Sequence, residues 1–107
     1  MMDKNIKEEI VEKVSQDDLH LFMKGTPLFP ECGFSNTVVQ ILTYLDAPFS
    51  STNVLENEDI REGIKEYSNW PTIPQLYFKG EFIGGCDIIK EMFESGELKE
   101  ELKDVII

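Results

Sequence analysis

A short and nearly all-apolar run, Leu19 to Met23, constrains the fold of this chain most strongly. Such a run is typical of a β-strand that is buried on both faces, and a strand of that kind needs helices on each side of its sheet. A loop rich in proline and glycine follows, from Gly25 to Glu31, and leads to Cys32 at the start of a periodic apolar segment, Asn36 to Leu45. This order predicts a thiol at the N-terminus of a helix.

The rest of the chain alternates helices and strands. The first helix is expected to be amphipathic, with Ile6, Ile10, Val11 and Val14 at helical spacing, and a second strand is expected at Phe49–Val54. A third helix from Asn57, with Ile60, Ile64 and Tyr67 inward, precedes a hairpin of strands at Gln75–Phe78 and Glu81–Ile83. A fourth helix, with Ile88, Ile89, Met92 and Phe93 inward, and a short closing helix near Leu98 and Leu102 complete the chain. Strands joined through a helix should be parallel, and hairpin strands antiparallel. We predict an α/β fold, with residues 1–107 forming one domain in which helices flank both faces of a mixed four-stranded sheet.

Charge and apolar content exclude several kinds of partner. Ten basic and twenty-one acidic side chains give a net charge of -11, which argues against nucleic acid and anionic membranes because both need a basic surface. No apolar stretch approaches the roughly 18 residues of a membrane span. The N-terminal residues lack the apolar core of a secretory signal, so we expect a reducing, cytoplasmic location; an organellar matrix stays open. The acidic surface is interpreted as solvated, with a basic protein partner as the alternative.

Cys32 is the first candidate for chemistry. Free N–H groups and the positive end of the helix dipole favour a thiolate over a thiol at a helix N-terminus, and Gly33 leaves space beside the sulfur. We therefore favour a reactive or metal-ligating thiol over an inert buried cysteine. Ser35 stands where a Cys-x-x-Cys redox pair would carry its second thiol, so Cys32 has no close neighbour with which to form a disulfide.

Two backbone segments are candidates for binding. A proline that enters a sheet from a turn, as in Thr72-Ile73-Pro74, can be cis and expose the preceding residue's N–H and C=O to an extended peptide. Taken alone, an ordinary loop proline is favoured, because about one X–Pro bond in twenty is cis. The second segment, Gly84-Gly85-Cys86-Asp87, offers free N–H groups for a carboxylate and an acid for an amine, which suits an amino-acid head group. Cys86 itself is interpreted as packed or peripheral.

Two cations and one histidine complete the candidates. Lys24 and Arg61 are ordinary surface charges if they stand alone, but near the cysteine loop of so acidic a chain they suit a carboxylate. His20, inside the first strand, is interpreted as a hydrogen-bonded core or edge residue in preference to a ligand. A zinc site from Cys32, Cys86 and His20 lacks paired ligand spacing.

Three motifs together resemble one family. They are Met23-Lys24-Gly25-Thr26-Pro27 with Pro30-Glu31-Cys32-Gly33-Phe34-Ser35, then Trp70-Pro71-Thr72-Ile73-Pro74-Gln75-Leu76-Tyr77, then Gly84-Gly85-Cys86-Asp87. In order and spacing they resemble the monothiol glutaredoxins of the Cys-Gly-Phe-Ser type, over nearly the whole chain. The resemblance implies a thioredoxin-like fold, which agrees with the element order above.

The resemblance also implies a glutathione site. In that family, residues matching Lys24 and Arg61 hold the glycine-end carboxylate of glutathione. The residue matching Ile73, before a cis-proline, pairs with the tripeptide through its backbone, although an aromatic residue often stands there. Residues matching Cys86 and Asp87 hold the γ-glutamyl end, and Trp70 is associated with the cluster-side surface.

A [2Fe–2S] cluster is the cargo that the resemblance implies. Such a cluster takes four thiolates, and one chain offers one well-placed cysteine. Cys32 from each of two subunits and two glutathiones would supply four, so we expect a homodimer with the cluster and a monomer without it. The implied function is cluster transfer or assembly and iron and redox homeostasis, with apo iron–sulfur proteins as acceptors.

Two alternatives come from other functional classes. One is a glutathione-dependent oxidoreductase, in which the Cys32 thiolate attacks glutathionylated substrates and a second glutathione resolves the mixed disulfide. The long Gly25–Glu31 loop favours the carrier through the family resemblance, with weak oxidoreductase activity beside it. The other is a thioredoxin-like adaptor that recruits partners such as BolA-like proteins, which is compatible with the carrier.

Overall fold

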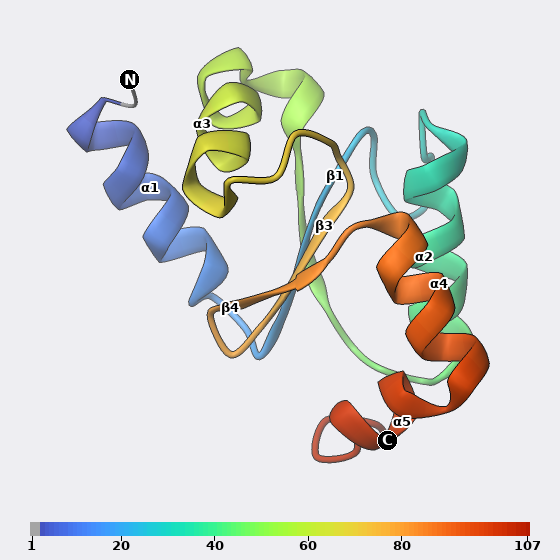
Figure 1. The fold of residues 1–107 in the computed structure, drawn as a ribbon. Helices are drawn as coiled ribbons and strands as arrows, with labels where there is room; N and C mark the ends of the chain where they lie inside the picture. Colours follow the sequence, from blue (N-terminus) through green and yellow to red (C-terminus); the bar gives the residue numbers. More distant parts are fainter. Residues whose placement is uncertain (1–2) are drawn as a thin grey trace.

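Helices and strands alternate along the chain in the predicted order. The computed structural model describes residues 3–107. Met1 and Met2, which belong to the predicted domain and to the segment where no secretory signal is expected, lie outside this range. The elements are α1 (Lys4–Val14), β1 (Leu19–Met23), α2 (Gly33–Tyr44), β2 (Ser50–Asn53), the 3₁₀ turn η1 (Val54–Glu56), α3 (Glu58–Ser68), β3 (Gln75–Phe78), β4 (Glu81–Gly84), α4 (Cys86–Ser95) and α5 (Glu97–Glu101) (Figure 1).

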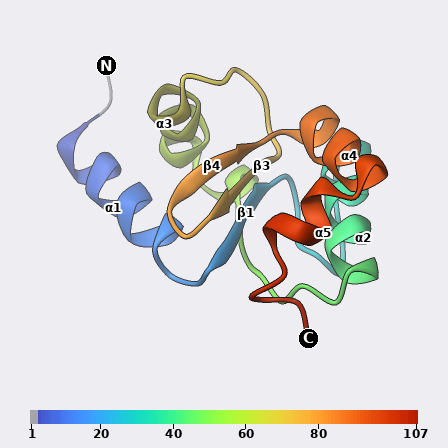
Figure 2. The ribbon, with the colours of Figure 1, turned by 60° about the horizontal axis from the view of Figure 1, so that its bottom comes forward.

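The four strands form one mixed sheet in the order β2-β1-β3-β4. β1 pairs in parallel with β2 and antiparallel with β3, and β4 pairs antiparallel with β3. Figures 1 and 2 show the sheet between two helical layers, with α1 and α3 on one face and α2, α4 and α5 on the other. The predicted mixed sheet with helices on both faces is confirmed.

Burial of β1 on both faces divides the core into two clusters. All five residues of β1 are buried, as predicted. Because side chains alternate along a strand, Leu19, Leu21 and Met23 pack with α2, α4 and α5, whereas Phe22 packs with α1 and α3. The two clusters fix the helices on opposite faces of the sheet, and the loops at its upper edge in Figure 1 carry the candidate site.

Two apolar residues that the helical pattern assigns to inward faces are exposed instead. Val11 is 43% exposed and Ile88 is 39% exposed, while their neighbours Ile10 and Ile89 are fully buried. Adjacent residues of an α-helix point about 100° apart, and here Ile10 and Ile89 face the core while Val11 and Ile88 lie at the edge of the buried face. The predictions for Val11 and Ile88 are therefore wrong.

Predicted turns and caps agree with the structure more closely than predicted boundaries do. The Asn57 side chain accepts a hydrogen bond from the Ile60 N–H at 3.2 Å and caps α3, and Gly96, with φ of 85°, ends α4. However, α2 begins at Gly33 instead of Asn36, and β2 ends at Asn53 because Val54 begins η1. The earlier start of α2 puts Cys32 directly at the helix N-cap.

His20 is a hydrogen-bonded core residue, as predicted. Its side chain is fully buried, its Nδ1 lies 2.7 Å from Ser50 Oγ, and its Nε2 lies 2.7 Å from Thr52 Oγ1. The pKa of His20 is lowered from 6.5 to about 4, chiefly by burial and also by the charge of Lys13, while Asp17 opposes the shift. The imidazole is therefore neutral in the folded chain at pH 7.

The lowered pKa of His20 should make the fold acid-sensitive. As the pH falls from about 6.5 to about 4.5, the unfolded chain takes up a proton at His20 that the folded chain does not. His20 should therefore reduce the free energy of unfolding by about 2 kcal/mol over that interval. Urea unfolding at a series of pH values measures this, and His20→Gln, which does not titrate, should lack the component. Equal pH slopes for wild type and variant would contradict it.

Candidate functional site

Cys32 occupies the N-cap of α2 and is partly exposed. Its backbone is extended, with φ of -155°, and its C=O accepts the first helical bond from Asn36 N–H at 2.9 Å. Desolvation raises the pKa of the Cys32 thiol, but hydrogen bonds from the backbone of Ser35 and Phe34 and from the Ser35 hydroxyl, together with the charge of Lys24, lower it more. The net result is a lowered pKa, as expected for a thiol at a helix N-terminus.

Ser35 connects the start of α2 to the end of β1. Its side chain is fully buried, and its Oγ accepts a hydrogen bond from the Lys24 N–H at 3.1 Å. The same hydroxyl stabilises the thiolate of Cys32. The sequence singles out Ser35 because no second thiol stands at that position. The structure adds that the hydrogen bond from Lys24 to Ser35 holds Lys24 near Cys32.

The loop between β1 and Cys32 is closed by its own hydrogen bonds. Gly25 and Pro30 form a β-bridge, the Glu31 N–H donates to the Lys24 C=O at 2.9 Å, and the Gly25 N–H donates to Asn53 Oδ1 at 2.9 Å. The loop presents Leu28 and Phe29 to solvent, at 85% and 76% exposure. Cys32 therefore follows a hydrogen-bonded loop that exposes two large apolar side chains.

A cavity of about 200 Å³ lies between the loop before β3 and the start of α4. Its lining residues are Phe34, Trp70, Thr72, Ile73, Pro74, Gly85, Cys86, Asp87 and Ile88. The Ile73–Pro74 peptide bond is cis. The cavity therefore brings together three predicted site residues: Ile73, Cys86 and Asp87.

The two thiols differ in ionisation. Burial and the Asp87 carboxylate raise the pKa of Cys86, and proximity to Cys32 raises it further, against the lowering effects of Lys90 and Thr37. Cys32 is thus the thiol that ionises first, and the two cysteines lie within electrostatic range of each other. The assignment of reactivity to Cys32 and of a peripheral role to Cys86 stays a prediction.

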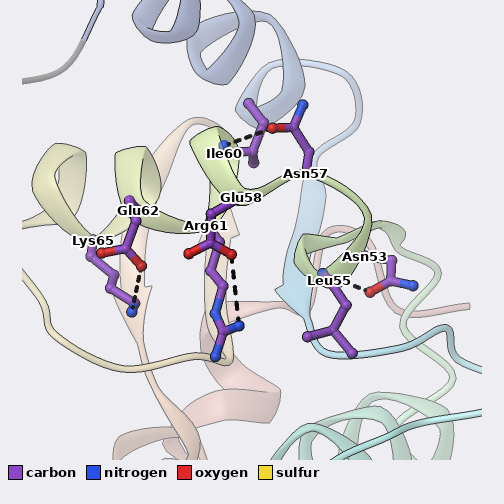
Figure 3. A network of polar contacts seen from close by, with 8 residues as sticks. All are labelled: Asn53, Leu55, Asn57, Glu58, Ile60, Arg61, Glu62 and Lys65. Carbon is purple, nitrogen blue, oxygen red and sulfur yellow. Dashed lines mark hydrogen bonds and ion pairs between the residues drawn. The ribbon is translucent and has the colours of Figure 1, made fainter.

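The two predicted cations stand apart from that cavity. Neither Lys24 nor Arg61 is among its lining residues. The Arg61 Nη1 lies 3.9 Å from Glu58 Oε2, and its buried Nε has no hydrogen-bond partner among residues 3–107. In Figure 3 the guanidinium extends from α3 in the direction away from α1, while the Lys65–Glu62 pair lies further along the helix. Lys24 is close enough to Cys32 for its charge to lower the pKa of the thiol, whereas the ion pair of Arg61 is with Glu58 on α3.

Sequence reasoning left two lining residues without a role. Phe34, in the Cys-Gly-Phe-Ser motif, is 62% exposed beside Cys32, and Ile88 faces the cavity instead of the core. The glycine at position 84 is the sequence feature that could have indicated the position of Ile88. A Cβ added to Gly84 would lie 2.7 Å from the Ile88 side chain, so the two residues pack together.

A lowered-pKa cysteine at the N-cap of the helix after β1, a cis-proline before β3 and this sheet order define a thioredoxin-like thiol protein. The family model for glutaredoxin matches residues 19–83, more than half of the chain. The chain belongs to the glutaredoxin family, and its relatives assign it to the monothiol members.

Two relatives show how far the similarity extends. The chain is 59% identical over 98 residues to monothiol glutaredoxin-S14, chloroplastic, of Arabidopsis thaliana, covering 92% of this chain and 57% of that protein. It is 54% identical over 102 residues to the monothiol glutaredoxin ycf64-like of Synechocystis, covering 95% of each. The chain thus spans little more than half of the first relative and nearly all of the second.

Solved structures confirm the thioredoxin-like glutaredoxin fold. The solution structure of reduced poplar apo GrxS14 superposes with a TM-score of 0.82 at 57% identity, covering 94% of this chain and 92% of that one. The buckwheat glutaredoxin–glutathione complex superposes with a TM-score of 0.84 at 23% identity, covering 97% and 94%. The second likeness is one of fold alone.

The predicted compartment stays a prediction. The name of the Arabidopsis relative includes the compartment chloroplastic. Glutaredoxin-related protein 5 of Danio rerio, 54% identical over 98 residues, is named as mitochondrial. Between residues 3 and 107, no helix is both long and apolar enough to cross a membrane.

Proposed function

We propose that this monothiol glutaredoxin binds glutathione and carries a [2Fe–2S] cluster between two subunits, for transfer to apo iron–sulfur proteins. The observation that carries the proposal is a lowered-pKa Cys32 beside a buried, hydrogen-bonded Ser35. A thiolate is the form that binds iron. Ser35 stands where a second cysteine would form a disulfide with Cys32, and its hydroxyl accepts the Lys24 N–H. The Cys32 sulfur therefore stays free for an external ligand.

The cavity supports the glutathione part of the proposal. Ile73 lines it and would offer its main chain to an extended tripeptide, and Asp87 at the start of α4 would offer a carboxylate to the γ-glutamyl amine. Free N–H groups in the first turn of α4, around Cys86, suit the γ-glutamyl carboxylate. Lys24 and the partly exposed guanidinium of Arg61 would take the glycine-end carboxylate.

The donor set fits a shared cluster. Among residues 3–107, no three side chains of His, Cys, Asp or Glu gather as a metal site, and the two thiols differ in ionisation. One subunit thus offers Cys32 as a single thiolate, and a cluster with four thiolate ligands would take the others from a second subunit and from two glutathiones. The exposed Leu28, Phe29 and Phe34 supply apolar surface around Cys32 for that second subunit, or for a BolA-like partner.

Anaerobic reconstitution with iron, sulfide and glutathione tests this proposal. We expect a coloured dimer with charge-transfer absorption, formed only in the arm that contains glutathione, and a colourless monomer after the cluster is removed. Absorption spectroscopy with size-exclusion chromatography measures both properties. A chain that stays colourless and monomeric in the complete mixture would refute the carrier function.

The lowered pKa of Cys32 also favours a second function, the reduction of glutathionylated thiols. The Cys32 thiolate would attack the glutathione sulfur of a mixed disulfide, form a Cys32–glutathione disulfide and release the substrate thiolate. A second glutathione thiolate would then attack that sulfur, release Cys32 and leave oxidised glutathione. High turnover in a glutathione–disulfide assay, without cluster binding, would favour this function over the carrier.

A further inference from the structure

Gln75, the first residue of β3, is a fully buried polar side chain whose hydrogen-bonding groups are all occupied by nearby partners. Its Nε2 donates to the Trp70 C=O at 3.1 Å and to the Thr72 C=O at 3.2 Å. Its Oε1 accepts from the Tyr77 hydroxyl at 3.0 Å. A tyrosine hydroxyl can donate or accept, whereas the two loop carbonyls only accept, so the carbonyls fix the amide nitrogen toward the loop and its oxygen toward Tyr77.

The Gln75 amide thereby ties the loop before β3 to the rigid sheet. Gln75 lies opposite Phe22 in the β1–β3 ladder, and Tyr77 is buried against the rings of Phe22 and Phe82. The Trp70 N–H donates to the Lys65 C=O and to the Ser68 Oγ, both at 3.1 Å, and so ties the start of the loop to the end of α3. The two amide donors of Gln75 tie two carbonyls of the same loop to the sheet.

That loop forms one wall of the cavity. Trp70, Thr72 and Ile73 line it on one side, and Gly85 and Cys86 line it on the other. The walls meet closely, because a Cβ added to Gly85 would lie 3.0 Å from Trp70 Nε1 and 3.3 Å from the Pro74 C=O. A loop released from Gln75 would move the Ile73 backbone relative to the start of α4.

We propose that Gln75 is a positioning residue for glutathione: it holds the Trp70–Pro74 loop so that the Ile73 backbone faces the tripeptide. This role rests on the proposed glutathione site. It requires two donors aimed at the loop, so the side chain at this position must be an amide held by Tyr77, and a side chain of similar size without donors would not serve.

The variants Gln75→Glu and Gln75→Met test the donors in different ways. An ionised glutamate accepts hydrogen bonds only, so both loop carbonyls lose their donor at pH 8. Burial raises the pKa of a glutamate, and in its neutral form it regains one donor. We expect affinity for reduced glutathione to fall roughly tenfold or more at pH 8 and to recover partly near pH 6. Gln75→Met should lose a similar amount at both pH values.

Titration with reduced glutathione, followed by the amide resonances of Ile73 and Cys86, measures these affinities. Ile64→Val is the control, because Ile64 is a buried residue of the core cluster that contains Tyr77 and does not line the cavity. Tyr77→Phe should weaken binding less than either Gln75 variant, since it removes only the bond to the amide oxygen and leaves both bonds to the loop. Thermal unfolding of every variant reports its stability.

The outcomes separate this role from the proposed function. Wild-type chain that binds no glutathione at either pH overturns the glutathione site and the role of Gln75 together. Wild-type binding with unchanged affinity in Gln75→Glu and Gln75→Met overturns the role of Gln75 alone. So does a loss of affinity that Ile64→Val shares at equal loss of stability, or a loss in Gln75→Glu that does not depend on pH.

Discussion

Replacing Cys32 by serine is expected to abolish the chemistry of this protein while leaving its fold intact. A serine hydroxyl does not ionise near neutral pH, so the stabilisation that lowers the pKa of Cys32 has no thiolate on which to act. Cluster colour should be absent after reconstitution, and reduction of a glutathionylated substrate should fall by roughly a thousandfold or more.

Stability should not explain that loss. Serine is a favoured N-cap residue, and its Oγ can accept from the same Phe34 and Ser35 N–H groups that lower the pKa of Cys32. The free energy of unfolding of Cys32→Ser should thus change by no more than about 0.5 kcal/mol, and in the stabilising direction if it changes. Urea unfolding, run beside the absorption spectrum and the activity assay, separates the two effects.

Cys86→Ser is the matched control for the same chemistry. Cys86 begins α4 and has a raised pKa, so it is the poorer thiolate at neutral pH although it lines the cavity. Most of the colour and activity should survive its replacement. Equal loss in Cys86→Ser and Cys32→Ser would show that the ligand assignment is wrong.

The features that sequence predicted well are those with a local cause. An apolar run of five residues is enough to bury β1 on both faces, and one side chain is enough for the Asn57 cap. Cys32 belongs with these features, because a loop, a cysteine and a periodic segment in order place a thiol at a helix N-terminus wherever the helix packs.

The features that sequence could not supply depend on how distant segments meet. Ile88 looks like one more apolar residue of a helix, and its places beside Gly84 and in the cavity lining appear only once α4 packs against the end of β4. Arg61 was grouped with Lys24 by charge, yet its position depends on the docking of α3 and its nearest acid is Glu58. Gln75 gave no signal of its own, since its three partners become neighbours only when the loop folds over β3.

Gly25→Ala should be the most destabilising of the glycine substitutions near the site. Gly25 has φ of +90°, and a Cβ there would lie 2.6 Å from both Glu31 N and Phe29 O, two backbone atoms of its own loop. The left-handed conformation costs an alanine about 1–2 kcal/mol, and the clash adds a similar amount. We expect a loss of about 3 kcal/mol and a melting temperature lower by roughly 15 °C.

Gly80→Ala isolates the first of those two costs, the left-handed conformation. Gly80 also has a positive φ, of +82°, in the turn between β3 and β4, but a Cβ there meets no atom within 4 Å. It should lose about 1–2 kcal/mol from conformation alone. Thermal unfolding of both variants measures the difference between their losses of stability. Equal losses would show that the loop closed by the Gly25–Pro30 bridge accommodates a Cβ at Gly25 without further destabilisation.

The same pair of variants connects the loop to the thiol. The Gly25–Pro30 bridge and the Glu31–Lys24 hydrogen bond close the segment that leads to Cys32, and Lys24 contributes to the lowered pKa of that cysteine. If Gly25→Ala opens the loop, Lys24 moves away from the sulfur and the pKa of Cys32 should rise. The rate of alkylation by iodoacetamide as a function of pH reports that pKa. Gly80→Ala, far from the loop, should keep the wild-type profile, whereas a shift of equal size in both variants would attribute the effect to general destabilisation.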